Sequence, residues 1–286
     1  MSQTRYICPD GVEIRIEECL QGCRLREELE CGRCVSRRVL KKIAESRQWT
    51  GTPTVTQLIN GTREEYLKLT QEYAVSPQEM MPAMFGSAVH AYLEKASDDN
   101  ESLSEQRLCD PTGSYTGQFD YYDAATQTLY DTKTYGSYKA AQVLGLEKIS
   151  IPTGEYYRNG REKMKTEYVK GLKHRRDATL QLNAYRLMLE NKGYPVKQMA
   201  LEVLIRDGGT WVAQSRGLTQ NALLIPINKV SDSRLQKYMK KKRHELLKAL
   251  EEKKLPLPCR ASECWHGRKC QSYCAVRKYC ERGREK

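Results

Sequence analysis

Two aspartates and a lysine lie within a short stretch of the chain whose pattern predicts a β-hairpin. Residues 118–122 and 128–134 are rich in Phe, Tyr, Thr and Leu, which favour strands, and the five residues between them are short and polar enough for a turn. Side chains two apart on a strand share a face, so Asp131 and Lys133 point the same way, and the hairpin can bring Asp120 beside them. The hairpin therefore predicts two carboxylates and one ammonium in a small volume.

This residue set suits a metal-dependent hydrolytic centre. Two carboxylates at close quarters repel each other, and Mg²⁺ or Mn²⁺ relieves the repulsion because hard cations prefer oxygen ligands. Lys133 can then hold a phosphate oxygen or orient a water molecule, which predicts phosphodiester cleavage. Asp-x-Lys by itself is common, so a hairpin with ordinary surface charges is the alternative.

Composition bounds the class of protein and of partner. The chain has 286 residues with 29% charged and 39% hydrophobic residues and a formal net charge of +12. No apolar run approaches the roughly 20 residues that span a bilayer, and the N-terminus lacks a signal-peptide apolar core, so we expect a cytoplasmic protein without membrane contact. A strongly basic chain favours a nucleic-acid partner, with a merely well-solvated surface as the alternative.

Eleven cysteines form the second compositional signal. Five lie near each end of the chain and Cys109 lies between them. An odd count in a reducing compartment argues against a disulfide framework and for metal binding. The N-terminal group is Cys8, Cys19, Cys23, Cys31 and Cys34. We predict that four of these five bind zinc, and the spacing leaves open which four.

The C-terminal cysteine group predicts a second metal site. Its members are Cys259, Cys264, Cys270, Cys274 and Cys280. Thiolates suit both Zn²⁺ and iron–sulfur clusters, so the identity of the metal stays open here.

Periodicity and punctuation divide the chain into three parts. We expect a cysteine-rich module at 1–35, a core at 36–255 with an insertion at about 136–175, and a cysteine cluster at 256–286. Expected helices are 36–47, 56–73, 77–96, 137–144, 177–192 and 231–254, with a basic helix from about Arg161 inside the insertion. Expected strands include 200–205, 210–213 and 223–227.

Two of the helices carry polar residues that could reach the hairpin. The helix at 77–96 holds Gly86 and, one turn later on the same face, His90. A lone helical histidine is more often structural than a ligand. The helix at 177–192 holds Gln181 and Tyr185, which are four apart and also share a face.

The order of these motifs resembles the RecB-type branch of the PD-(D/E)XK nucleases. Gly86-x3-His90, Gly117-x2-Asp120, Asp131-Thr-Lys133 and Gln181-x3-Tyr185 follow one another on a helix, two strands and a helix. The chain is especially similar to CRISPR-associated and phage exonucleases with a C-terminal cysteine cluster, and the resemblance covers about residues 54–280. It implies an α/β restriction-endonuclease-like core, in which helices flank a mixed sheet, with cysteine-rich metal-binding ends.

The resemblance also implies roles for single residues. His90, Asp120 and Asp131 would bind Mg²⁺ or Mn²⁺ together with the backbone carbonyl of Thr132. Lys133 would position or activate the attacking water and stabilise charge on the phosphate. Gln181 and Tyr185 would hold this lysine or the DNA backbone near the scissile phosphate.

The chain departs from this family at the iron–sulfur site. The family has one cysteine before the histidine helix and three near the C-terminus. Gly61 stands at the expected early position, in Thr54-Val-Thr-Gln-Leu-Ile-Asn-Gly61-Thr-Arg-Glu-Glu-Tyr-Leu67, while Cys270, Cys274 and Cys280 match the late triplet. We expect Cys264 as the fourth ligand of a [4Fe-4S] cluster or zinc ion, with Cys259 or the N-terminal group as alternatives.

The sequence therefore predicts a metal-dependent deoxyribonuclease. We expect an exonuclease that acts on single strands or DNA ends in recombination, repair, phage replication or CRISPR adaptation. One alternative is a non-catalytic nucleic-acid-binding protein that uses its cysteine modules and basic helices. Another is a nuclease subunit that is active only in a larger complex.

Overall fold

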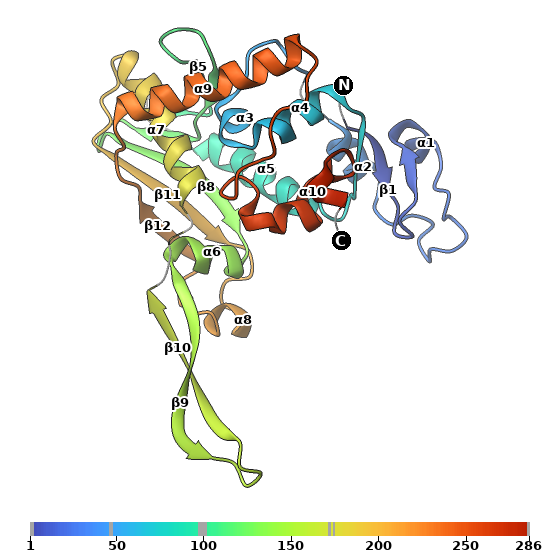
Figure 1. Cartoon of the computed structure of the whole chain (residues 1–286), viewed down its shortest axis with the longest axis vertical. Coiled ribbons are helices and arrows are strands. Elements are labelled where there is room, and N and C mark those ends of the chain that lie inside the picture. Colours follow the sequence, from blue (N-terminus) through green and yellow to red (C-terminus); the bar gives the residue numbers. More distant parts are fainter. Residues whose placement is uncertain (1–2, 46–47, 97–101, 171–172, 174, 285–286) are drawn as a thin grey trace. The chain divides into compact units, whose positions relative to one another are not determined.

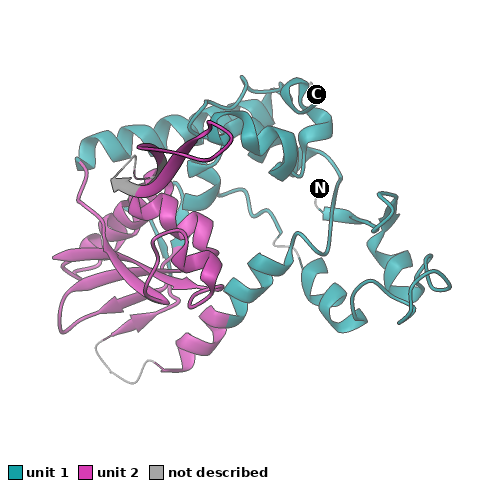
Figure 2. Ribbon diagram, turned by 90° about the horizontal axis from the view of Figure 1, so that it is seen from below, with its two compact units in different colours: residues 1–88, 107–117, 231–286 teal, residues 89–106, 118–230 magenta. Residues whose placement is uncertain are grey.

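The computed structural model describes residues 3–45, 48–96, 102–170, 173 and 175–284 (Figure 1). The described chain forms two compact units (Figure 2). The first unit comprises residues 1–88, 107–117 and 231–286, and the second comprises residues 89–106 and 118–230. None of the described helices is both long enough and apolar enough to cross a lipid bilayer.

The second unit is built on a mixed five-stranded sheet, as the sequence predicts. Its strand order is β12 (Ala222–Pro226), β11 (Gln198–Ile205), β8 (Thr128–Tyr135), β7 (Tyr121–Asp123) and β4 (Leu103–Ser104). The central strands β8 and β11 run parallel, and the other neighbouring pairs are antiparallel. The predicted hairpin is confirmed as β7 and β8.

Two predicted helices pack against the central strands of this sheet. Helix α6 (Ser137–Leu144) contacts β8 and β11, and helix α7 (Arg176–Asn191) contacts β8. Gly145 and Gly193 follow these helices with φ of +74° and +88°, the left-handed conformation in which helices commonly end. The unit is therefore a mixed α/β structure with helices flanking a sheet.

The core of the second unit follows the alternation of its strands. Met199, Leu201, Val203 and Ile205 are buried on β11, with the intervening side chains only partly buried. Leu129 of β8 and Leu182 and Leu189 of α7 are fully buried as well. In the parallel register Leu201 lies beside Asp131, so the candidate carboxylate sits in the middle of an apolar sheet.

Two segments of the second unit differ from their predicted secondary structure. The insertion forms a second hairpin, β9 (Leu146–Tyr156) and β10 (Glu162–Lys170), where a basic helix was expected. Antiparallel pairing along these strands, with one register shift between Glu162 and Met164, outweighs the helical preference of the lysines. Residues 211–214 form the short helix α8 (Trp211–Gln214) instead of a strand, because the Thr210 side chain accepts from the Ala213 amide and starts a helical turn.

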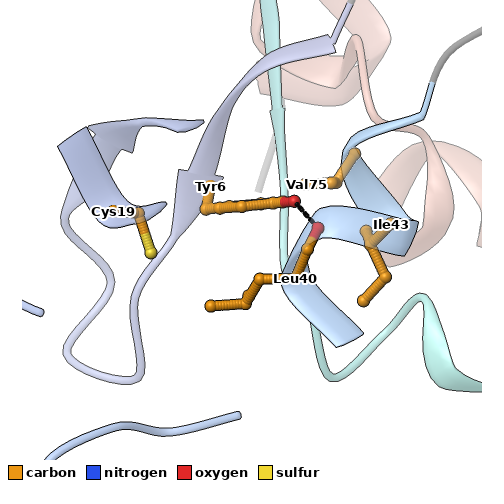
Figure 3. Packing of buried hydrophobic residues seen from close by; sticks show 5 residues of the cluster. All are labelled: Tyr6, Cys19, Leu40, Ile43 and Val75. Atoms are coloured by element: carbon orange, nitrogen blue, oxygen red, sulfur yellow. Dashed lines mark hydrogen bonds between the residues drawn. The ribbon is translucent and has the colours of Figure 1, made fainter. Parts of the chain in front are cut away.

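The first unit contains a three-stranded sheet and several helices. The sheet order is β2 (Glu13–Arg15), β1 (Gln3–Ile7) and β3 (Tyr73–Val75). Figure 3 shows the buried cluster formed by Tyr6, Cys19, Leu40, Ile43 and Val75. The Tyr6 hydroxyl donates to the Leu40 carbonyl at 2.6 Å. This bond fixes helix α2 (Arg37–Ala44) on β1, and the predicted end of that helix at residue 47 lies outside the described residues.

The helix predicted at 56–73 is two helices, α3 (Val55–Ile59) and α4 (Thr62–Thr70). Thr54 and Gln57 form a capping box that starts α3, and the chain turns out of helical geometry at Asn60 and Gly61. Helix α4 packs against α9 (Asp232–Glu251) through Tyr66, Leu67, Leu246 and Ala249. A third predicted helix appears as α5 (Met81–Leu93) with one further turn, η1 (Glu94–Ala96).

The remaining elements of the first unit are short. Strands β5 (Arg107–Cys109) and β6 (Thr116–Gln118) pair with each other, and β6 ends at the boundary with the second unit. Helix α1 (Ile16–Gln21) follows β2. The C-terminal cysteine segment forms η2 (Trp265–Gly267), η3 (Lys269–Tyr273), η4 (Arg277–Tyr279) and α10 (Glu281–Arg284).

Candidate metal-dependent active site

The hairpin turn fixes the position of the two aspartates in the second unit. Asp123 accepts from the amides of Ala125 and Thr126 and from the Thr126 hydroxyl, which closes the turn between β7 and β8. Asp120 directly precedes β7, and its Oδ2 accepts from the Thr132 amide at 2.6 Å. The carboxylate of Asp120 is thereby tied to the strand that carries Asp131 and Lys133.

Lys133 joins the two carboxylates. Its Nζ lies 2.7 Å from Asp131 Oδ1 and 3.9 Å from Asp120 Oδ2. It also donates to the Thr132 carbonyl at 3.4 Å. The structure therefore brings together the hairpin residues that the sequence singles out.

The second oxygen of Asp131 is the least satisfied atom of the site. The Asp131 side chain is 0% exposed, and no hydrogen-bond donor among the described residues reaches its Oδ2. A buried carboxylate oxygen without a partner is costly, and a cation is one of the few groups that can compensate it. Asp131 thus offers one oxygen to a cation, although it is not part of the group of possible ligands, His90, Glu105 and Asp120, that the described residues bring within 4.8 Å of one another.

His90, on α5, lies beside Asp120. Its Nδ1 is 2.9 Å from Glu105 Oε1 and 3.8 Å from Asp120 Oδ1. One ligand atom from each of these three side chains lies within 4.8 Å of the others. An imidazole nitrogen and two carboxylate oxygens at this separation can bind a single Mg²⁺ or Mn²⁺ ion.

Glu105 is the site residue that the sequence did not reveal. It lies in a polar stretch with several acidic residues and without periodicity, so no signal distinguishes it from its neighbours. Its amide donates to the Asp120 carbonyl at 2.9 Å, and Gln118 donates to its Oε2 at 2.8 Å. Its φ of +50° is unusual for a residue with a Cβ, and such strain often accompanies functional positions.

Helix α7 places Tyr185 near the hairpin carboxylates and Gln181 beside Tyr185. Gln181 Nε2 donates to Tyr185 Oη at 3.0 Å. Burial, and then the negative charge of Asp131, raise the pKa of Tyr185 to about 12. The hydroxyl therefore stays protonated and can donate a hydrogen bond toward the carboxylates or a phosphate.

Burial and neighbouring charges raise the pKa values of both Asp120 and Lys133. Burial, and then the neighbouring Asp131, raise the pKa of Asp120 to about 6. Burial opposes the charge on Lys133, but Asp131 and Asp120 outweigh it and raise the pKa of this lysine overall. Lys133 is thus a permanent ammonium suited to stabilising negative charge rather than to abstracting a proton.

The five C-terminal cysteines line one hollow of the first unit. They share it with Arg63, Glu64 and Lys269. Burial, and then the nearby Cys264, raise the pKa of Cys270 to about 11, and burial raises that of Cys274 to about 11. Among the described residues, no three cysteine sulfurs lie within 4.8 Å of one another.

Gly61 is in direct steric contact with this group. A Cβ added to Gly61 would lie 2.2 Å from the Cys259 Sγ. The backbone at Gly61 has φ −64° and ψ 128°, which any residue can adopt, so the constraint is one of space. The sulfur of Cys259 already fills the volume that a side chain at position 61 would need.

Four of the five N-terminal cysteines are neighbours in the first unit. The thiol of Cys19 is electrostatically coupled to those of Cys8, Cys34 and Cys23, whereas Cys31 is exposed. Cys8 begins a tight turn in which Gly11, with φ +84°, donates to the Cys8 carbonyl at 2.9 Å. Cys8, Cys19, Cys23 and Cys34 are therefore the better candidates for a shared ligand set.

Comparison of the chain with models of known protein families and with curated protein sequences gives no match.

The raised pKa of Asp120 predicts a pH-dependent stability of the metal-free protein. The folded state holds this proton up to about pH 6, whereas an unfolded aspartate loses it near pH 4. The stabilising contribution is complete below about pH 4 and is lost as the pH rises through 6. Asp120→Asn should therefore gain stability relative to wild type between pH 4 and pH 7.5, by on the order of 3 kcal/mol.

Urea unfolding in EDTA, followed by circular dichroism, measures this difference. Asp123→Asn in the same hairpin is the matched control. Hydrogen bonding from Thr126 lowers the pKa of Asp123, so its stabilising contribution is complete above about pH 4, and Asp123→Asn should be less stable than wild type by a nearly constant amount between pH 4 and pH 7.5. A pH-independent difference for Asp120→Asn would contradict the assigned protonation.

Proposed function

We propose that this protein is a metal-dependent nuclease that hydrolyses DNA phosphodiester bonds. The observation that carries the proposal is the pairing of Lys133 with Asp131 and Asp120, which leaves one buried oxygen of Asp131 unpaired. A cationic lysine between carboxylates suits a reaction in which a metal ion and a phosphate meet. The net charge of +12 supports a polyanionic substrate.

The arrangement of elements supports a restriction-endonuclease-like core for the second unit. A helix supplies His90, a hairpin in a mixed sheet supplies Asp120, Asp131 and Lys133, and a further helix against β8 supplies Tyr185. This is the order in which a RecB-type nuclease presents its motifs. Within this proposal, DNA ends or single strands are the substrate.

The chain's own residues have separate tasks in the proposed reaction. His90, Asp120, Asp131 and the Thr132 carbonyl would hold Mg²⁺ or Mn²⁺. When bound, such an ion neutralises phosphate charge and makes a water molecule more acidic. Lys133 stabilises the negative charge that grows on the phosphate oxygens, because its ammonium is held in place by Asp131. The Tyr185 hydroxyl, oriented by Gln181, donates a hydrogen bond from the α7 side.

Loss of the Asp131 carboxylate or of the Lys133 ammonium should strongly slow cleavage. Asp131→Asn and Lys133→Met should each lower the rate at least a hundredfold, because one removes a metal ligand and the other a fixed positive charge. End-labelled linear and circular single-stranded DNA, incubated with Mn²⁺ or Mg²⁺, measures the rate and separates exonuclease from endonuclease action. Lys192→Met, at an exposed position of the same unit, is the control and should cleave normally.

Intact DNA with the wild-type protein under both metals would contradict the proposal. Unchanged cleavage by Lys133→Met would move the activity to another site. Binding without cleavage would instead favour a non-catalytic nucleic-acid-binding protein.

We further propose Glu105 as a metal ligand beside His90 and Asp120. Glu105→Gln keeps the size of the side chain but removes its charge. We expect the Mn²⁺ concentration for half-maximal activity to rise about tenfold or more, since even the loss of a hydrogen-bond partner of a metal ligand typically lowers metal affinity by this amount. Activity titrations with Mn²⁺ measure the shift, and Glu251→Gln, at an exposed position of α9, is the control. An unchanged titration would exclude Glu105 from the metal site.

The C-terminal hollow is proposed to hold an iron–sulfur cluster. All five C-terminal cysteines line this hollow. The match of Cys270, Cys274 and Cys280 to the late cysteine triplet of the nucleases that the chain resembles supports a cluster there. We propose Cys259, Cys270, Cys274 and Cys280 as ligands. Cys259 is preferred to Cys264 because its sulfur fills the volume that a side chain at position 61 would occupy. The four N-terminal neighbours, Cys8, Cys19, Cys23 and Cys34, are proposed to bind zinc.

Exchange of the sulfur between positions 259 and 61 tests this ligand set. Cys259→Ser should lose most of its iron and visible absorption, whereas Cys109→Ser, outside the cluster, should keep both. The double variant Gly61→Cys/Cys259→Gly should regain iron, because the new side chain enters the vacated volume. Anaerobic purification with iron, sulfide and zinc analysis provides the measurement. Full iron in Cys259→Ser, or zinc in place of iron, would contradict the proposal.

A further inference from the structure

The β9–β10 hairpin is an exposed arm of the second unit that the proposed active site does not use. Its strands form a separate two-stranded sheet, and α6 contacts β9 at its base (Figure 1). Residues 152–161 are all exposed. A two-stranded hairpin without a core behind it is marginally stable in water, so its length is not explained by packing.

The end of this arm combines aromatic rings with positive charge. Tyr156, Tyr157 and Met164 are 63%, 55% and 52% exposed. Lys163 Nζ lies 5.7 Å from the centre of the Tyr157 ring and 3.0 Å from Glu155 Oε2. Residues 155–165 contain four cationic and two acidic side chains: Arg158, Arg161, Lys163 and Lys165, and Glu155 and Glu162. The tip therefore carries net positive charge beside solvent-exposed rings.

The geometry of the tip is defined rather than random. The Tyr157 amide donates to the Arg161 carbonyl at 2.8 Å, and Gly160, with φ +77°, donates to the Tyr157 carbonyl at 2.9 Å. Asn159 Oδ1 accepts from the Arg161 amide at 3.1 Å. This turn holds Arg158 and Arg161 at the end of the arm, on either side of the reversal.

We propose that this arm binds single-stranded DNA, with bases stacked on Tyr156 and Tyr157 and phosphates held by Arg158 and Arg161. The proposal rests on DNA as the substrate of the proposed nuclease. Exposed aromatic rings interleaved with cations are the combination that binds unpaired strands, since every base has a face to stack and every nucleotide a phosphate to neutralise. A paired duplex keeps its base faces covered, which is why the rings favour a single strand.

Fluorescence anisotropy with a labelled single-stranded 20-mer tests the arm on the full-length protein in EDTA, where no cleavage occurs. Tyr156→Ala/Tyr157→Ala should weaken binding about tenfold or more, with a smaller effect on the matching duplex. Arg158→Gln/Arg161→Gln should flatten the logarithmic salt dependence by about 1.4, at about 0.7 per phosphate contact. Tyr138→Ala and Lys192→Gln/Lys197→Gln, at exposed positions of the same unit, should bind like wild type.

A shortened arm provides a second variant that does not depend on single side chains. Pro152 and Met164 are paired across the hairpin, so Asn-Gly can replace residues 153–163 as a two-residue turn. This variant should lose single-strand affinity as the tyrosine variant does. Circular dichroism checks that all variants fold.

Wild-type affinity in the shortened and tyrosine variants would overturn the proposal. An equal loss of single-strand and duplex affinity in the tyrosine variant would overturn base stacking. Because binding is measured without metal, these outcomes are separate from the nuclease test. A protein that binds through the arm but cleaves no DNA would contradict the proposed activity alone.

Discussion

A carboxylate buried inside an apolar sheet is the constraint on which the second unit depends. Asp131 lies on the central strand β8, beside Leu201 of β11 and two residues after the fully buried Leu129. Its charge is compensated by Lys133 from the same strand, at 2.7 Å. A buried ion pair of this kind costs desolvation and is weak evidence for stability. The proposed metal chemistry would explain why the chain keeps this costly position.

The rest of the site is arranged around this carboxylate by three separate elements. The hairpin ties Asp120 to the Thr132 amide, α5 supplies His90, and α7 supplies Tyr185. Burial, and then Asp131, raise the pKa of Asp120, and the two carboxylates raise the pKa of Lys133 against the effect of its burial. Neighbouring groups with strongly shifted pKa values are typical of functional sites.

Buried ion pairs also fix the C-terminal cysteine segment of the first unit. Lys269 pairs with the buried Glu64 at 2.5 Å, and Lys242 pairs with Glu263 at 2.7 Å. Arg63 Nη1 approaches the Cys280 Sγ at 3.8 Å, and its Nε donates to the Pro256 carbonyl at 2.7 Å. These buried charges hold the cysteine segment against α4 and α9, so metal binding in the hollow would stabilise that attachment as well.

The sequence by itself determined the mixed α/β composition, most of the helices and the hairpin with Asp120, Asp131 and Lys133. Local periodicity and turn residues are short-range properties, and the turn that the Asp123 side chain closes involves only residues next to it in the sequence. The sequence did not reveal Glu105, the β10 strand or the break at Gly61. Glu105 meets Asp120 and β10 pairs with β9 across a turn, and the space for a side chain at Gly61 is taken by the Cys259 sulfur from far along the chain. Only the tertiary structure decides such contacts, because no local pattern records which distant atom will occupy a given space.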